Sequence, residues 1–401
     1  MIPKGWSSQK LSSVASIIDC KHRTPEYVKS GIPLVSPGTI KWGALDLISP
    51  VKRVTEEEYR SLMDHCVVEQ GDLVMSRNQS VGVVSYVDSK KPFVLGQDTV
   101  LIKAIHADWR FIYYTLQSDL VQRQIAKSAG GSTFSRINLS DIRALNIKTP
   151  AICEQDKISQ ILTAWDKAIS VTEKLLTNSQ QQKKALMQQL LTGKKRLPDE
   201  NGVSFSGAWK WLRAAELFKT ISQKNNSEDE ELLAVTQDLG VIPRSMLERR
   251  VVMPDGSTKG YKLVVPGNFI ISLRSFQGGL EYSRYRGLVS PAYTVLTPIK
   301  KIVDEFYKQY YKSYDFIGHL AVAVIGIRDG KQISYEDFSF LKLPYPEIEE
   351  QQKIAAVLSA ADAEISTLEK KLACLKDEKK ALMQQLLTGK RRVKVDEAVA
   401  E

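Results

Sequence analysis

The sequence has few cysteines, and none of them forms a recognisable metal or redox motif. Cys20, Cys66, Cys153 and Cys374 are scattered over 401 residues without a CxxC pair. This spacing argues against a disulfide framework and against the common zinc motifs. We therefore expect the four thiols to be structural or incidental, and we expect the chain to hold no metal.

The histidine pattern is equally poor in catalytic signals. His22, His65, His106 and His319 show neither HxH nor HExxH spacing, which the common metal-dependent hydrolases require. The sequence also lacks the [DN]PP[YF] tetrapeptide of amino-methyltransferases and the glycine fingerprint of nucleotide cofactors, and SPAY at Ser290 is interpreted as a turn. We expect no catalytic residue in this chain.

Two glycine-lysine pairs resemble the end of a phosphate-binding loop without completing it. TGKK and TGKR have no glycine five positions before Gly193 or Gly389, and a basic residue stands where Ser or Thr would bind magnesium. Both pairs follow stretches rich in helix-forming residues. We interpret them as helix caps, with cations at the negative end of the helix dipole.

Long apolar runs are also missing. No run approaches the roughly 18–20 residues that span a bilayer, and the start, MIPKGWSSQK, lacks the apolar core of a signal peptide. We expect a cytoplasmic protein. The net charge of +10 and the pI near 9.2 favour a polyanionic partner such as nucleic acid, but only slightly, because many basic proteins bind none.

The strongest feature that is present is an internal repeat. KKALMQQLLTGK occurs at Lys183–Lys194 and again, 196 positions later, at Lys379–Lys390. Further identities extend upstream at the same offset and fade only gradually, and they pair Glu154, Gln155, Ile158, Leu162 and Asp166 with Glu350, Gln351, Ile354, Leu358 and Asp362. A period this long indicates two similar halves rather than a solenoid array.

Each half ends in a long predicted helix. No glycine or proline occurs from Glu154 to Thr192, and the sequence predicts a second helix from Glu350 to Thr388. Such a helix is roughly 57 Å long at 1.5 Å per residue. Apolar residues recur at alternating spacings of four and three, and this seam comprises Ile354, Leu358, Ala361, Ile365, Leu368, Leu372, Leu375, Leu382 and Leu386 in the second helix.

The first helix has a weaker seam at the same spacing, interrupted by Thr172, Ser179 and Lys183. A seam of this period packs on another helix. If an approximate twofold axis relates the halves, the two helices pack antiparallel as a spacer with the globular domains at opposite ends. The alternative, that each helix covers its own core, is disfavoured because the helices match each other better than the domains do.

The parts that precede the helices predict α+β domains. Short β-branched runs such as GDLVMSRN and TVLIKA alternate with turn residues, Trp109–Ala129 has helical periodicity, and GGSTFSRINLSDI is expected to return the chain to a strand. We predict a first globular domain at 1–150, a long helix at 151–197, a second globular domain at 198–345, and a second long helix with a tail at 346–401.

This organisation resembles the specificity subunit of type I restriction-modification systems over essentially the whole chain. The residues that carry the resemblance are the Pro-x-x-x-x-Gln-x-x-Ile entries PAICEQDKI and PEIEEQQKI, the LMQQLLTGK helix ends, and the phrases GDLVMSRN and PGNFIISLRS. The resemblance implies two pseudo-symmetric halves. In each half, an α/β target recognition domain reads one part of a split double-stranded DNA sequence, and a conserved helix sets the gap between the parts.

The resemblance also implies partners. Two modification subunits carry S-adenosylmethionine and methylate adenine at N6, while restriction subunits in the full complex translocate and cleave DNA with ATP and magnesium. The resemblance implies that the chain itself supplies DNA sequence specificity and a scaffold for the other subunits, without a cofactor or a catalytic role of its own.

Side chains that read bases are expected on loops and strands. In the first domain the candidates are Arg77, Asn78, Gln79, Ser80, Ser132, Thr133, Ser135 and Arg136, and in the second they are Arg274, Ser275, Gln277, Tyr282, Arg284, Tyr285 and Arg286. The exposed faces near the repeated helix ends are candidates for partner binding, and they comprise Lys183, Lys184, Gln188, Gln189, Lys379, Lys380, Gln384 and Gln385. Each candidate could instead be an ordinary solvated residue.

Two other functions stay open at this stage. A helical scaffold that joins protein partners would have the same paired helices, but it would show no salt-dependent DNA affinity. A fused methyltransferase would require the cofactor and NPPY-type motifs that the sequence lacks.

Overall fold

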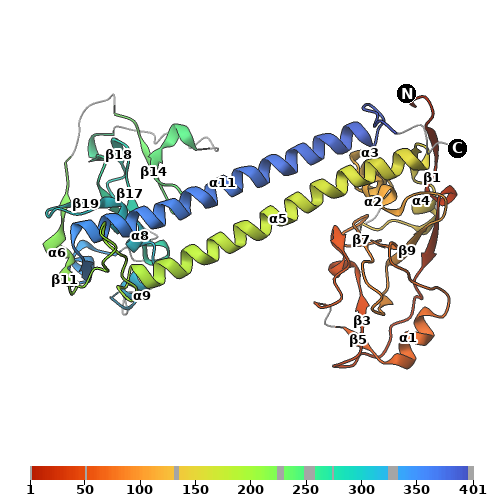
Figure 1. Ribbon diagram of the computed structural model, residues 1–401, viewed down its shortest axis with the longest axis horizontal. Helices are drawn as coiled ribbons and strands as arrows, with labels where there is room; N and C mark the ends of the chain where they lie inside the picture. Colours follow the sequence, from red (N-terminus) through yellow and green to blue (C-terminus); the bar gives the residue numbers. More distant parts are fainter. Residues whose placement is uncertain are drawn as a thin grey trace. The chain divides into compact units, whose positions relative to one another are not determined.

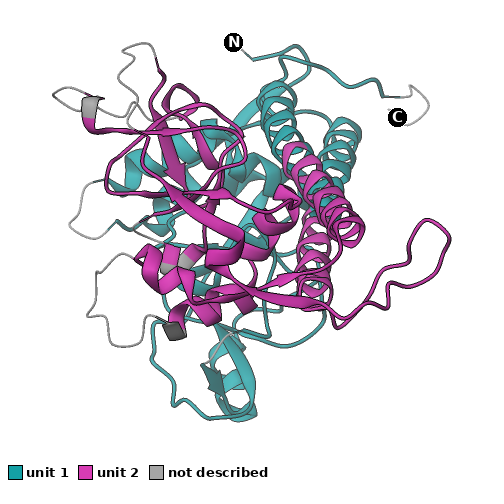
Figure 2. Ribbon diagram, turned by 90° about the vertical axis from the view of Figure 1, so that its left-hand side faces the viewer, with its two compact units in different colours: residues 1–172, 371–401 teal, residues 173–370 magenta. Residues whose placement is uncertain are grey.

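The computed structural model describes residues 2–49, 52–130, 135–223, 230–247, 258–272, 275–323 and 333–395. The chain divides into two compact units, which Figure 2 shows in different colours: unit 1 comprises 1–172 and 371–401, and unit 2 comprises 173–370. The helices α5 (Ile152–Leu190) and α11 (Ile348–Leu386), which are labelled in Figure 1, each contribute one part to each unit. No helix among the described residues is both long and apolar enough to cross a membrane.

Unit 1 is built around a five-stranded sheet with the order β2-β9-β6-β7-β4, in which only the β4–β7 pair is parallel. A three-stranded sheet, β5-β3-β8, and the antiparallel pair β1–β10 complete it. The strands are β1 (Ser7–Lys10), β2 (Ala15–Asp19), β3 (Ile32–Val35), β4 (Gly43–Ala44), β5 (Arg53–Val54), β6 (Leu73–Ser76), β7 (Val84–Tyr86), β8 (Val94–Leu95), β9 (Thr99–Ala104) and β10 (Asn146–Thr149).

Short helices pack beside these strands. They are η1 (Leu11–Ser13), η2 (Pro37–Thr39), α1 (Glu56–Met63), α2 (Trp109–Gln117), α3 (Asp119–Ala129) and α4 (Leu139–Arg143). The sequence predicted one helix over Trp109–Ala129, but Ser118 is extended and its side chain accepts a hydrogen bond from the Val121 N–H, which caps a second helix. The prediction of a strand after residue 130 was also wrong for Leu139–Arg143, because these residues form the helix α4.

Unit 2 repeats the central order with β12-β19-β16-β17, beside the antiparallel pairs β13–β14, β15–β18 and β11–β20. Its strands are β11 (Lys210–Arg213), β12 (Phe218–Ile221), β13 (Leu233–Thr236), β14 (Gly240–Pro243), β15 (Lys262–Val264), β16 (Phe269–Ile271), β17 (Glu281–Tyr282), β18 (Gly287–Val289), β19 (Thr294–Pro298) and β20 (Lys342–Tyr345). Its short helices are α6 (Ala214–Leu217), η3 (Arg244–Met246), η4 (Thr258–Gly260), α7 (Ser275–Gly278), α8 (Asp304–Tyr311), α9 (Tyr314–Ala323) and α10 (Tyr335–Ser339).

The long helices end where the sequence predicted a cap. Gly193 and Gly389 both have φ 71°, a left-handed conformation that glycine adopts without the steric cost of a side chain. The N–H groups of Lys195 and Arg391 then donate to the carbonyls of Gln189 and Gln385. Both glycine-lysine pairs are therefore helix caps.

Each unit's core joins the start of one long helix to the end of the other. In unit 1, Ile158 and Leu162 of α5 share a hydrophobic cluster with Leu386 of α11. In unit 2, Leu190 of α5 shares one with Ile354 and Leu358 of α11. Because the start of one helix meets the end of the other, α5 and α11 pack antiparallel within each unit, which confirms the predicted pairing.

Candidate nucleic-acid and partner interfaces

Two loops of unit 1 that were predicted to read DNA lie side by side. Asn78 and Arg136 form an isolated antiparallel β-bridge, and the Ile137 N–H donates a hydrogen bond to the Arg77 carbonyl at 3.0 Å. The fold thus brings together side chains that are almost sixty residues apart in the sequence.

Asp98, which was not among the predicted residues, joins these two loops. The Arg136 Nη2 lies 2.7 Å from its Oδ1, and the Asn78 Nδ2 donates to its Oδ2 at 2.7 Å. Its backbone has φ 62°, which Asp tolerates better than most residues. The GQD turn between the runs PFVLG and TVLIKA is the signal that could have identified it.

Arg77 is placed differently from the prediction. Its side chain is buried, with only 5% of the residue exposed. Its Nη1 donates to Asp19 Oδ1 at 2.9 Å, and its Nε donates to the Ile137 carbonyl at 3.2 Å. A buried guanidinium held at both ends does not reach a base edge, so we remove Arg77 from the DNA-contacting set.

The other candidates in unit 1 differ in exposure. Gln79, in a left-handed conformation with φ 55°, and Ser135 are exposed, whereas the Ser80 hydroxyl is half-buried and donates to the Pro37 carbonyl at 2.9 Å. Ser132 and Thr133 lie outside the described residues.

In unit 2 two of the predicted arginines, Arg284 and Arg286, are exposed and paired with carboxylates. Arg284 forms an ion pair with Glu305, and Arg286 Nε lies 2.9 Å from Glu230 Oε1. The side chains of Arg284 and Arg286 are 61% and 56% exposed. Because exposed ion pairs of this kind are weak, both guanidinium groups can exchange a carboxylate for an anionic ligand.

The neighbouring tyrosines are half-buried. The Tyr282 hydroxyl donates to Asp304 Oδ2 at 3.3 Å, and burial together with the nearby carboxylate of Asp304 raises the pKa of Tyr282 to about 12. Tyr282 therefore stays a neutral donor at physiological pH. Tyr285 packs against a small core that includes Leu233.

Ser275 is a second correction. It is 1% exposed, and its hydroxyl accepts a hydrogen bond from the Ser272 N–H at 2.8 Å, so it supports the start of α7 instead of facing a ligand. Arg274 and the side chain of Gln277 lie outside the described part of unit 2.

A buried carboxylate anchors the start of α5 in unit 1. Glu154 accepts the Arg392 Nε at 2.7 Å and its Nη2 at 2.8 Å. The Trp6 indole N–H donates to the same carboxylate at 3.2 Å, and the Arg392 guanidinium lies over the Trp6 ring, 6.0 Å from its centroid. We call Glu154, Arg392 and Trp6 the unit 1 clamp.

Unit 2 contains the same arrangement. Glu350 accepts the Arg196 Nε at 2.5 Å and its Nη2 at 2.7 Å, and the Trp209 indole donates to it at 2.9 Å. The hydrogen bonds to Glu350 and its negative charge raise the pKa of Arg196. Glu350 and Arg196 stand 196 positions from Glu154 and Arg392, so each clamp ties the start of one long helix to the chain that follows the other.

The glutamine of the Pro-x-x-x-x-Gln-x-x-Ile motif has a structural role in both units. Gln155 donates to the Pro150 carbonyl at 2.8 Å and accepts from the Asp108 N–H. Gln351 donates to the Pro346 carbonyl at 2.9 Å and accepts from the Val303 N–H. The motif therefore fixes the entry of each long helix against its globular domain.

The lysines Lys183 and Lys379 do not lie on free helix faces. Lys379 Nζ is 2.5 Å from Asp166 Oδ1, and Lys183 Nζ is 2.5 Å from Asp362 Oδ1. The two lysine side chains are only 15% and 21% exposed. They bridge α5 and α11, so they are removed from the partner-binding set. The repeat of Asp166 at Asp362 was the sequence feature that pointed to such an ion pair in each half.

The remaining partner-binding candidates are exposed, and four of them line two grooves at repeat-related places in the two units. Groove 1, of ≈ 330 Å³, lies between the end of α11 and the α2–α3 junction, and its walls include Lys380, Met383, Gln384, Thr388 and Asp119. Gln384 donates to Asp119 Oδ2 at 2.9 Å across it.

Groove 2, of ≈ 600 Å³, lies between the end of α5 and the α8–α9 junction, and its walls include Lys184, Met187, Gln188, Thr192 and Asp315. Each of these five residues has a counterpart of the same type in groove 1, at a distance of 196 positions in the sequence. Four of them precede their counterparts, and Asp315 follows Asp119. Gln189 and Gln385 are exposed beside the grooves. Each unit thus presents the same set of side chains at the end of a long helix.

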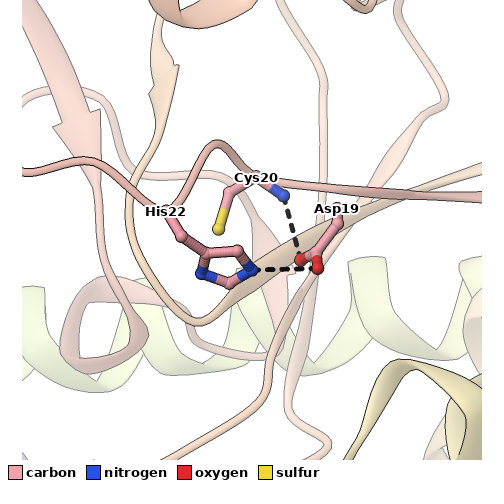
Figure 3. A group of neighbouring side chains, drawn as sticks. All are labelled: Asp19, Cys20 and His22. Atoms are coloured by element: carbon pink, nitrogen blue, oxygen red, sulfur yellow. Dashed lines mark hydrogen bonds and ion pairs between the residues drawn. The ribbon is translucent and has the colours of Figure 1, made fainter.

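Asp19, Cys20 and His22 are the only metal-ligand cluster that emerges among the described residues. Figure 3 shows the His22 ring and the Asp19 carboxylate facing each other, 3.1 Å apart, with the Cys20 sulfur beside them. The Asp19 carboxylate already accepts from Arg77 and from the Cys20 N–H, and burial raises the pKa of the Cys20 thiol. A cation here would compete with the Arg77 guanidinium, so hydrogen bonding accounts for the cluster better than metal binding does.

Comparisons with known proteins give a consistent result. The chain matches the type I restriction modification DNA specificity domain over residues 3–178 and again over residues 208–376. It is 26% identical, over 98% of its own length and 95% of the relative's, to a protein of Methanocaldococcus jannaschii provisionally named the type I restriction enzyme MjaX specificity subunit.

Solved structures share the fold. The S subunit of a type I restriction-modification system from M. genitalium superposes with a TM-score of 0.60 at 16% identity, covering 96% of both chains. A chain from a study of complex assembly and conformational transition of the type I system gives 0.57 at 18% identity, covering 98% of this chain and 100% of that one. Since the family domain is matched twice and covers most of the sequence, the protein belongs to the type I restriction-modification DNA specificity family and carries two target recognition domains.

Proposed function

We propose that the globular domains of units 1 and 2 each contact one half of a split double-stranded DNA target, and that the long helices dock two copies of one adenine-N6 modification subunit. The chain then acts as a non-catalytic address and scaffold. One observation carries this proposal: the helix ends of the two units present the same side chains, whereas the loops predicted to read DNA differ between them.

Docking surfaces that share these side chains suit two copies of one partner. A protein that binds the Lys, Met, Gln and Thr side chains of groove 1 meets the same four residue types in groove 2. The positions that stay in the proposed docking set are Lys184, Gln188, Gln189, Lys380, Gln384 and Gln385. The similarity to a chain studied for type I complex assembly supports partners of this kind.

Different reading surfaces suit a target with two unlike halves. Among the described candidates, Arg136 and Gln79 are exposed donors of unit 1, and Arg284 and Arg286 are exposed donors of unit 2. Arginine and glutamine side chains are the donors that read base edges in the major groove. A split target also needs a stiff connection, because a shift of one base pair rotates a half-site by roughly 35° around the duplex.

A methylation map tests the proposal. The gene is expressed together with its modification subunit gene in a host that lacks the system, and modified bases in the host DNA are sequenced beside a control without this gene. We expect a single motif of two parts, separated by a fixed number of unspecified base pairs, with N6-methyladenine in each part. A map identical to the control, with both proteins present and associated, would favour the alternative of a protein-joining scaffold.

A further inference from the structure

The carboxylate of Asp98 has both of its oxygens occupied by side chains that come from different loops of unit 1. Arg136 binds Oδ1 and Asn78 binds Oδ2, each at 2.7 Å. The Asp98 carbonyl also accepts the Arg77 N–H at 2.8 Å, and the Arg77 side chain is anchored in the core. The carboxylate is therefore fixed at its backbone and at both oxygens.

Among the described residues, Asp98 is the only ion-pair partner of the Arg136 guanidinium. The Arg136 side chain is 45% exposed, whereas that of Asp98 is 22% exposed. A guanidinium has five N–H donors in a planar fork, and one salt bridge leaves enough adjacent donors for a second, bidentate contact. Guanine presents two adjacent acceptors, O6 and N7, in the major groove, and a bidentate arginine contact to them is the commonest specific protein–DNA contact.

An acidic residue at this place needs an explanation beyond stability. An ion pair with an arginine this exposed contributes little to folding, and a negative charge beside DNA repels phosphates. A carboxylate whose two oxygens already accept from Arg136 and Asn78 is also a poorer acceptor for a cytosine amino group. Orienting the arginine is the role that fits all three facts.

We propose that Asp98 is a positioning residue that holds the Arg136 guanidinium to read a guanine in the first half of the target. This inference rests on the proposed DNA-reading function and assigns a base type and a supporting residue to it. Asn78 fixes the second oxygen of Asp98, so that the orientation of the carboxylate, and with it the arginine, is set before DNA binds.

The test uses the whole complex of this chain with its modification subunit. Methylation maps are compared for the wild type, Asp98→Asn, Arg136→Ala, Arg136→Lys and the double variant Asp98→Asn with Arg136→Ala. We expect a guanine at one position of the first half in the wild type. Each single variant lowers discrimination at that position roughly tenfold or more, and the second half of the motif stays unchanged. The double variant resembles Arg136→Ala, because Asp98 acts through the arginine.

Several results would overturn the inference. Unchanged discrimination in Arg136→Ala or in Asp98→Asn would do so, as would relaxation at a position in the second half. Arg136→Lys keeps the charge without the fork, so full specificity in that variant would also contradict a bidentate contact, even if Asp98→Asn failed to fold. A wild-type complex that methylates no split motif would refute the proposed function itself, and it is thus distinguishable from a failure of Asp98 alone.

Discussion

The two units of this protein have the same side-chain contacts at the ends of their long helices, but different contacts in their recognition loops. At the helix ends, each clamp joins a buried glutamate, an arginine and a tryptophan with donor–acceptor distances between 2.5 and 3.2 Å. In the recognition loops, unit 1 ties Arg136 to Asp98, whereas unit 2 pairs Arg284 and Arg286 with separate glutamates. The units agree where the long helices are anchored and differ where DNA contact is proposed.

The buried clamps and the exposed loops are subject to different physical constraints. A clamp must satisfy the carboxylate of a buried glutamate, and few side-chain combinations do so, because an unpaired buried charge is very costly. An exposed loop carries no such restriction, so its polar residues can vary without loss of stability. One chain can therefore keep two equal docking ends and still carry two different reading surfaces.

The largest effect is expected from breaking the clamps. Arg196→Ala leaves Glu350, which is 1% exposed, without its ion-pair partner, and Arg392→Ala does the same to Glu154, whose side chain is 6% exposed. We expect Arg196→Ala to lower the free energy of unfolding by about 3 kcal/mol. Arg392→Ala should lower it by less, because the Arg392 side chain is 46% exposed. Urea denaturation followed by tryptophan fluorescence measures it, since Trp6 and Trp209 belong to the clamps.

Adjacent exposed residues provide matched controls. Lys195→Ala and Arg391→Ala remove a cation next to each clamp without touching the buried glutamate, and we expect changes within about 0.5 kcal/mol. The equivalence of the two clamps would be contradicted if only one of the two arginine variants were destabilised.

A smaller effect is expected at the grooves. Lys184→Glu and Lys380→Glu reverse one exposed charge in groove 2 and groove 1, respectively. If both grooves dock the same partner, each variant should weaken the binding of one modification subunit by about tenfold, or about 1.4 kcal/mol. Native mass spectrometry of the complex at decreasing concentration should then show the species with one bound copy accumulating.

The control for this comparison is Lys29→Glu, an exposed charge reversal outside both grooves, which should leave two copies bound. Two independent docking sites would be contradicted if one groove variant lost both modification subunits. They would also be contradicted if both variants kept both subunits.

The architecture could be predicted from the sequence because its signals are repetitive. The absence of glycine and proline from Glu154 to Thr192, the repeated KKALMQQLLTGK and the caps at Gly193 and Gly389 indicate the long helices by local physics alone. The pairing of the helices followed from the apolar seam, and its antiparallel direction followed from assuming a twofold relation between the halves. The antiparallel packing is confirmed in each unit.

The site could be predicted only in part, because burial and pairing depend on contacts that are distant in the sequence. Arg77 has the composition of a DNA-contacting residue, but the fold turns it toward Asp19. Lys183 and Lys379 interrupt the apolar seam, and only the structure shows that Asp362 and Asp166 neutralise them within the helix pair. The GQD turn indicates that Asp98 lies between two strands, but it does not show that the Asp98 carboxylate contacts Asn78 and Arg136, which come from two other loops.

The central claim is that the two recognition domains read DNA independently while the duplicated helix ends serve a common partner. The most direct test replaces residues 1–150 with the first domain of another family member, retaining Trp6 for its contact with Glu154, and maps methylation by the complex. We predict that one half of the motif changes, while the other half and the spacing stay as they were. A change in both halves would contradict this account.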